Sequence, residues 1–239
     1  MTTPPIDDCV GAIAALADPR RRALYRFVAA QDRAVGRDEA GDAAGLSRAA
    51  AAFHLDRMVD DGLLETEFRR LGGRRGPGAG RPSKLYRRAA AEIAVSLPAR
   101  QYDLAADLLA SAVRVATGDG RPVADALRRL ARERGKALAT TVAGGGHTGG
   151  PVTDERVTAD WAGVLAEYGY EPRVDGGGGV IVLANCPFHA LAARHPELVC
   201  GMNLALLEGF AGALPVPGWS ARLHPSGHGC CVRLSHMRR

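Results

Sequence analysis

The chain lacks the features that would export it or place it in a membrane. None of its apolar runs approaches the ~20 residues that a membrane-spanning helix needs. Its first residues, MTTPPIDD, lack the basic start and apolar core of a signal peptide. We therefore expect a cytoplasmic protein with no membrane partner, in a compartment that keeps thiols reduced. Clustered cysteines in such a compartment favour metal or redox chemistry over structural disulfides.

Two kinds of binding motif are also missing. The glycine run at residues 176–179 has neither GxGxxG nor GxxxxGK(S/T) spacing, and no strand leads from it into a helix. It is typical of a turn between the strands YEPRV and VIVLANC. The cysteines are not spaced as the CxxC pairs of zinc ribbons.

With 239 residues the chain exceeds the usual ~100–150 of one domain, so at least two domains are expected. The net charge of +5 is modest, but the basic residues gather in one place. Eight of them follow one another without an acid: Arg69, Arg70, Arg74, Arg75, Arg81, Lys84, Arg87 and Arg88. Such a run indicates a nucleic-acid contact or, in the simpler interpretation, a solvated loop.

The elements that precede this run favour the first interpretation. Asp18-Pro19 predicts an N-cap and a first helical proline, after a short helix around Val10–Leu16. A helix over 37–44 should end at Gly45, and Ser47 should cap a fourth helix that reaches Asp61. The strands LLETEF and LYRRA would then enclose the basic loop LGGRRGPGAGRPSK.

Helices followed by a basic hairpin predict a winged helix-turn-helix, whose recognition helix would be 47–61. The hairpin would set arginines against phosphates or in the minor groove. The residues expected to contact DNA are Ser47, Arg48, His54, Arg57, Arg69, Arg70, Arg74, Arg75, Arg81 and Lys84. For His54, packing beside the helix is an equal alternative.

Three segments carry a resemblance to a known family: LADPRRRALYRFV, AAGLSRAAAAFHLDRMVDDGLLE and GRPSKLYRR. Over residues 8–90 the chain resembles the ArsR/DeoR-like winged-helix regulators of actinobacteria. In such regulators a helix placed like Pro98–Thr117 is commonly the dimer seam. Because two-fold proteins read two half-sites, a homodimer on a double-stranded DNA operator is expected. Packing of this helix onto its own domain is the alternative.

Residues 185–239 hold four of the five cysteines and five of the seven histidines. Three thiols separated as Cys186-x13-Cys200-x29-Cys230 could converge, and a sulfur-rich pocket suits Fe–S clusters or zinc. Cys200 follows Pro196 in the first turns of a predicted helix, where the helix dipole favours the thiolate. In the predicted strand CCVRL, alternation would point Cys230 and Cys231 to opposite faces, so only one of them could readily join a site. Cys9 is expected to be a core residue.

The segments CPFHALA, HPELVCGMN and GCCVRL resemble the effector domain of the Suf-type repressors of iron–sulfur cluster biogenesis, over about residues 180–234. In that family a [4Fe–4S] cluster held by cysteines controls operator binding. The resemblance implies Cys186, Cys200 and Cys230 as cluster ligands. The chain departs from the four-cysteine pattern of cyanobacterial members, so His189, His195, Cys231, a carboxylate or an exogenous molecule could be the fourth ligand.

We expect an α+β protein of three parts. They are a winged helix-turn-helix over 1–90, a central helical dimerisation segment over 91–145, and a C-terminal α+β effector domain over 146–239 with a small antiparallel sheet. The expected function is a repressor whose DNA binding depends on an Fe–S cluster. Alternatives are a zinc or thiol-redox switch on the same fold, or an enzyme that pairs Cys186 with His189 or His195. No oxyanion element or third orienting residue accompanies that pair, so an enzyme is not expected.

Overall fold

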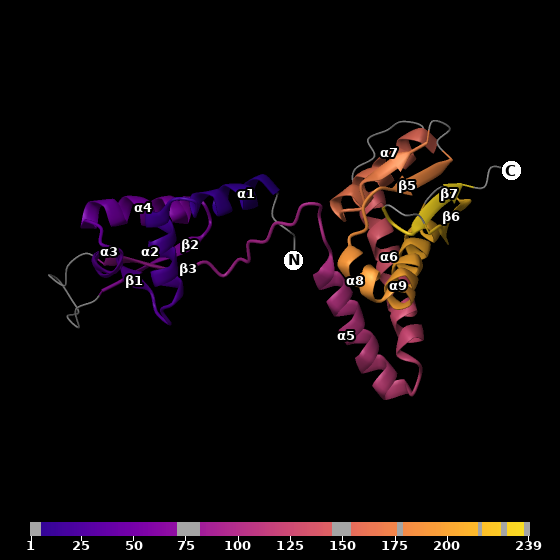
Figure 1. Ribbon diagram of the computed structural model, residues 1–239, viewed down its shortest axis with the longest axis horizontal. Coiled ribbons are helices and arrows are strands. Elements are labelled where there is room, and N and C mark those ends of the chain that lie inside the picture. Colours follow the sequence, from indigo (N-terminus) through magenta and orange to yellow (C-terminus); the bar gives the residue numbers. More distant parts are fainter. Residues whose placement is uncertain are drawn as a thin grey trace. The chain divides into compact units, whose positions relative to one another are not determined.

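The structure is a computed structural model, which describes residues 6–70, 82–144, 154–175, 179–214, 217–225 and 229–236. The chain forms two compact units, Met1–Val95 and Ser96–Arg239 (Figure 1). Both units mix helices with a small antiparallel sheet, which is compatible with an α+β protein. Within the described ranges, no helix is long and apolar enough to cross a membrane.

Unit 1 begins with two helices, continues with a short strand and two more helices, and ends in a hairpin. Its elements are α1 (Ile6–Ala15), α2 (Pro19–Ala29), β1 (Val35–Gly36), α3 (Arg37–Ala44), α4 (Arg48–Asp60), β2 (Leu64–Arg69) and β3 (Ser83–Arg88).

Helix boundaries in unit 1 follow the predicted capping residues. The Asp18 side chain accepts hydrogen bonds from the backbone N–H groups of Arg20 and Arg21, at 2.8 and 3.4 Å. Gly45 ends α3 in the left-handed conformation, with φ of 66°. Ser47 caps α4 by accepting from the N–H of Ala50 at 3.3 Å. These local predictions are confirmed because they depend on neighbouring residues alone.

The hairpin of unit 1 pairs β2 with β3 in antiparallel register from Leu64↔Arg88 to Arg69↔Ser83. β1 adds a third strand on the other side of β3, so the sheet order is β1-β3-β2. The helices and the sheet bury one apolar core. Its largest members are Leu24, Leu55, Met58, Leu64 and Tyr86.

Unit 2 has five helices and four strands among its described residues. They are α5 (Tyr102–Asp119), α6 (Val123–Gly144), α7 (Asp154–Glu167), β4 (Pro172–Val174), β5 (Val180–Leu183), α8 (His189–Arg194), α9 (Pro196–Gly212), β6 (Trp219–Leu223) and β7 (Val232–His236).

Helix α6 lies between α5 and α9, and all three run side by side (Figure 1). The crossing of α6 and α9 is built on two glycines. A Cβ on Gly135 would lie 1.8 Å from the carbonyl oxygen of Leu206, and a Cβ on Gly209 would lie 2.0 Å from that of Arg132. The backbones of α6 and α9 are therefore in direct contact at this crossing, and a side chain larger than that of glycine would prevent the contact.

The sheet of unit 2 has the order β4-β5-β7-β6, with every neighbouring pair antiparallel. Ile181, Leu234 and Ala221 lie side by side across β5, β7 and β6 and are buried. Helix α9 packs against β6 and β7, so its buried side chains join the same core.

Helix α5 lies in unit 2, where Ala105, Leu108 and Ala112 are buried in the core. Val113, on the same helix, is 52% exposed. From Ser96 onward, the region that we predicted as a central segment belongs to the same compact unit as the cysteines.

Three elements of unit 2 differ from expectation. α5 begins at Tyr102 rather than at Pro98, because residues 99–101 bind the loop that follows β5. The short helix α8 was not predicted. β7 begins at Val232, so Cys230 and Cys231 precede the strand instead of alternating within it.

Candidate functional site

Four cysteines of unit 2 come from three separate segments. Cys186 lies in the loop between β5 and α8, Cys200 lies in α9, and Cys230 and Cys231 lie just before β7. Cys186 and Cys230 are buried, whereas Cys200 and Cys231 are half-buried. All four are free thiols.

The four thiols form one connected group. Cys186 is hydrogen bonded to Cys230, Cys230 to Cys231, and Cys231 to Cys200. The prediction that only one of the adjacent pair could join a site is therefore wrong, because neither residue is held in a regular strand. Cys231 links Cys200 to Cys186 and Cys230 within this group, and their role as metal ligands stays a prediction.

The thiols of this group do not titrate alike. Hydrogen bonds from Cys230 lower the pKa of Cys186 and lower that of Cys231 to about 6. The same bonds, to Cys186 and then to Cys231, raise the pKa of Cys230, and burial adds to the effect. The group therefore keeps a proton on Cys230 while it stabilises a thiolate on a neighbour.

Cys200 does not behave as its position in a helix suggested. Burial raises its pKa to about 12, and the hydrogen bond and charge of Cys231 act in the same direction. Cys200 is the fifth residue of α9, and the dipole effect falls off within the first turn. The expectation of a dipole-stabilised thiolate at Cys200 is wrong.

An unpredicted polar pair supports Cys230 from within the core. The side-chain amide of Asn203, which is only 1% exposed, donates a hydrogen bond to the Cys230 Sγ atom at 3.1 Å. The buried Tyr170 hydroxyl donates to the oxygen of the same amide at 2.6 Å. The backbone N–H of Val232 lies 3.4 Å from the same sulfur. Two N–H donors on one sulfur stabilise negative charge there, as they do on metal-bound thiolates.

His189 and His195 lie close to the cysteines in the sequence, at the two ends of α8, and both are exposed. In the described part of the chain, no group of three or more His, Cys, Asp or Glu residues is arranged to hold a metal ion. The thiols instead interact with one another, through Cys230 and Cys231. The donor set, sulfur alone with N–H groups aimed at it, fits a thiophilic metal or cluster in its chemistry. Ligation would require the paired thiols to lose protons and separate.

The candidate DNA-contacting residues of α4 lie at its exposed surface or beside it. Ser47 caps the helix, and Arg48 forms an exposed ion pair with Asp38 at 3.2 Å. Arg57 pairs with Asp61 at 3.6 Å. His54 is half-buried and its charge acts on Asp18.

Arg69 and Lys84 of the hairpin have acidic neighbours. Arg69 lies 3.6 Å from Glu67, an exposed pair that costs little to exchange for a phosphate. Lys84 instead donates to Asp56 of α4 at 2.6 Å, and the Tyr86 hydroxyl donates to the same carboxylate oxygen. Lys84 thus ties the hairpin to α4. Arg70 is exposed, whereas Arg74, Arg75 and Arg81 lie outside the described residues.

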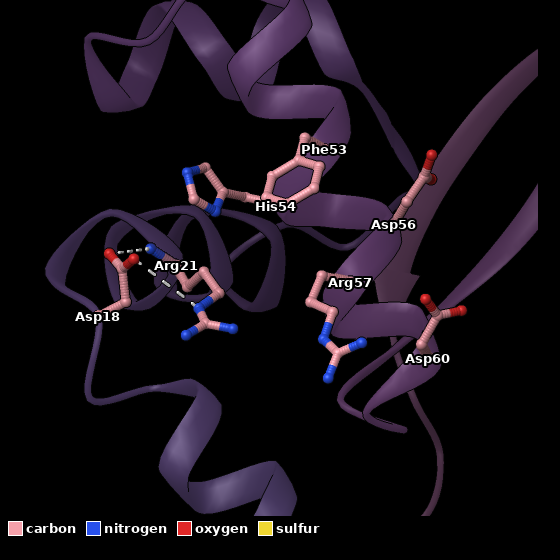
Figure 2. Close-up of a pocket in the computed structure, with 7 residues that line it drawn as sticks. All are labelled: Asp18, Arg21, Phe53, His54, Asp56, Arg57 and Asp60. Carbon is pink, nitrogen blue, oxygen red and sulfur yellow. Dashed lines mark hydrogen bonds and ion pairs between the residues drawn. The ribbon is translucent and has the colours of Figure 1, made fainter.

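A pocket of about 490 Å³ lies beside α4, between that helix and the start of α2 (Figure 2). It is lined by Asp18, Arg21, Phe53, His54, Asp56, Arg57 and Asp60. Three carboxylates balance its cations, so the lining does not favour an anion. Phe53, at its edge, is 69% exposed and contacts the His54 ring edge-on at 5.4 Å between centroids.

Comparison with known proteins adds no family, since no family model, curated protein or solved structure matches the chain. The function of the chain is therefore inferred from its own residues. Sequence reasoning missed Asn203, Tyr170 and Phe53 as candidate functional residues. A polar residue among the apolar residues of MNLALL was the one available signal for Asn203.

Proposed function

We propose that the chain is a DNA-binding transcriptional regulator, acting as a homodimer, whose binding to an operator is controlled at the four-cysteine group of unit 2. The observation that carries the proposal is that Cys186, Cys200, Cys230 and Cys231 interact as one group in unit 2. The other unit of the same chain has helix α4 followed by the basic β2–β3 hairpin.

The arrangement of unit 1 supports DNA binding through a winged helix-turn-helix. Helices α3 and α4 are joined by a turn at Gly45–Ser47, and a two-stranded hairpin follows. In that fold the second helix of the pair enters the major groove with its N-terminal residues. The first exposed side chains of α4 are Arg48 and Ala49, and Phe53 follows one turn later.

The donor chemistry of unit 2 supports an Fe–S cluster, with Cys186, Cys200 and Cys230 as ligands and Cys231 as the fourth. Thiolates are the ligands that such clusters require, and N–H groups directed at sulfur tune them. A bound [4Fe–4S] cluster would supply a centre that responds to oxidants and to iron. The protein's part would be to hold the ligands and to transmit their arrangement along the chain.

A thiol switch without metal is a second candidate, and the direct hydrogen bonds between thiols favour it. Cys186 and Cys230 are neighbours in the group, and so are Cys200 and Cys231. An oxidant such as a peroxide could join either pair as a disulfide, taking two electrons while the thiols release two protons. Zinc could occupy the same thiolates. Thiol counts before and after peroxide, together with metal content, separate these outcomes.

DNA binding is tested with an operator selected from a random library. Substitution of Arg74 and Arg75 by alanine should weaken binding to all sequences and reduce the slope of log affinity against log salt by ~2. Arg128→Ala with Arg129→Ala, two exposed arginines of α6 paired with Asp125 and Glu133, is the matched control. Unchanged affinity in the hairpin variant would contradict a DNA-contacting hairpin.

A further inference from the structure

The segment that leads from unit 1 into unit 2 is held on the loop that carries Cys186. Unit 1 ends at Val95, and residues 96–101 precede α5. The Arg100 guanidinium donates to the side-chain oxygen of Asn185 at 2.6 Å and to the backbone carbonyl of Cys186 at 2.8 Å. The Arg100 side chain of the connecting segment therefore hydrogen bonds to the backbone of Cys186, one of the four cysteines.

The buried side chain of Asn185 completes this contact from the other side. Its amide nitrogen donates to the carbonyl of Ala99 at 3.2 Å and to that of Gly169 at 2.5 Å. The backbone N–H of Gln101 donates to the carbonyl of Pro187 at 3.1 Å. Residues 99, 100 and 101 thus each hydrogen bond to the run Asn185–Pro187.

The connecting segment also packs too closely here to shift freely. Gly169 has φ of 80°, and a Cβ at this position would lie 2.9 Å from that of Ala99. At the first residue of α5, the Tyr102 hydroxyl accepts from the N–H of Ala190 at the start of α8. The contacts run along the loop from Asn185 to Ala190, with Cys186 inside it.

We infer that Arg100 and Asn185 are positioning residues that couple the thiol group to the segment leading to unit 1. Any chemistry at Cys186 that moves its backbone must break or strain the Arg100 and Gln101 hydrogen bonds. Because packed contacts have discrete arrangements, the segment then changes conformation with the state of Cys186. The inference rests on the proposed function only in its consequence, namely that DNA binding responds to the thiols.

The coupling is measured first without DNA. In the full chain, we compare the rate at which iodoacetamide modifies Cys186, resolved from the other cysteines by mass spectrometry. At a pH above the pKa of Cys186, where loss of the Arg100 charge no longer changes the thiolate fraction, Arg100→Gln should raise the Cys186 rate about tenfold or more. The loop then opens more often, and Arg100→Lys should restore part of the difference. The rates at Cys200 and Cys231 should change less than twofold, which excludes a general loosening of unit 2.

Arg194→Gln is the matched control. Arg194 lies in α8 and donates to the backbone carbonyl of Ala190 at 3.3 Å, so its loss also removes a guanidinium–carbonyl bond near the site. It should leave the Cys186 rate unchanged. Conversely, alkylation of Cys186 in the wild-type chain should speed amide hydrogen exchange of residues 96–102.

Either of two results would overturn the coupling. One is a Cys186 alkylation rate in Arg100→Gln within twofold of wild type. The other is amide hydrogen exchange of residues 96–102 that does not change when Cys186 is alkylated. The DNA step is separate. For the wild-type chain, operator affinity is measured before and after alkylation, and the two values give a ratio. If both coupling results hold, this ratio should be closer to one in Arg100→Gln than in wild type. If the wild-type ratio is already one, or no operator is bound, the proposed function fails while the coupling stands.

Discussion

Asn203 donates a hydrogen bond from its side-chain amide to the Cys230 Sγ atom, and the buried Tyr170 hydroxyl holds the other end of that amide. These two polar residues contact each other inside an otherwise apolar core. Buried polar groups stay in a core only when they are satisfied. The chain therefore keeps Asn203 oriented toward the sulfur.

Tyr170→Phe should lower the free energy of unfolding by ~1–3 kcal/mol, because it leaves the Asn203 oxygen buried without its donor. Asn203→Ala should cost a similar amount, since it strands the Tyr170 hydroxyl. In a double-mutant cycle followed by urea denaturation, the two changes should couple by ~0.5–3 kcal/mol. Additive effects would show that the two side chains do not act together.

The close crossing of α6 and α9 gives a prediction about stability alone. Gly135→Ala would place a methyl group against the Leu206 carbonyl, so the helices must separate, at a cost of ~3 kcal/mol or more. Gly201→Ala, in α9 but with nothing within 4 Å, should instead stabilise the protein by up to ~1 kcal/mol. Thermal denaturation of both variants checks the pair, and equal effects would contradict the crossing.

Cys231 should react as a thiolate near neutral pH in the reduced, metal-free chain. Its pKa of about 6 means that the deprotonated, reactive form is reached as the pH rises through about 6. Its alkylation rate should therefore level off by about pH 7, whereas a free thiol levels off only above its pKa of ~8.5.

The Cys230→Ala variant is the control for this pH dependence, because the hydrogen bond from Cys230 is the largest cause of the low pKa of Cys231. In this variant the midpoint of the rate profile should move upward, and the rate at pH 7 should fall. A wild-type midpoint near 8.5 would show that the thiols do not interact in solution.

Phe53 is predicted to read thymine by its methyl group. It lies on the face of α4 opposite the buried Ala51, Leu55 and Met58, and apolar side chains contact the thymine methyl in the major groove. Replacing the contacted thymine by deoxyuracil should weaken wild-type binding by about fourfold, since burial of one such carbon contributes ~0.8 kcal/mol.

The Phe53→Ala variant should bind the thymine and deoxyuracil operators equally. This comparison separates loss of the methyl contact from any change in the stability of α4, because both operators meet the same protein. If replacement of thymine by deoxyuracil leaves wild-type affinity unchanged at every position of the selected operator, Phe53 does not take part in base recognition.

The sequence predicted those features that depend on neighbouring residues. Asp18, Gly45 and Ser47 end or start helices by bonds to backbone within a few positions, so their roles were readable. The alternation argument at Cys230 and Cys231 failed because it assumed a strand that begins two residues later.

The contacts that Asn203 and Arg100 make with distant residues were not predicted. Asn203 meets Tyr170 across 33 positions of sequence, and Arg100 meets Cys186 across 86. Neither partner carries a local signal of the other. The late start of α5 also depends on distant residues. The backbone groups of Ala99 and Gln101 hydrogen bond to the loop that follows β5, and no local sequence pattern connects the two segments.

The proposed cluster site at the four thiols of unit 2 is tested by the visible spectrum of the full chain purified without oxygen, together with its iron, acid-labile sulfide and zinc content. A chain that holds the cluster should be brown, with iron and sulfide in equal amounts. Both should be lost in Cys186→Ser and Cys230→Ser but retained in Cys9→Ser. A colourless chain, without iron and sulfide even after anaerobic reconstitution, would contradict the proposed cluster site.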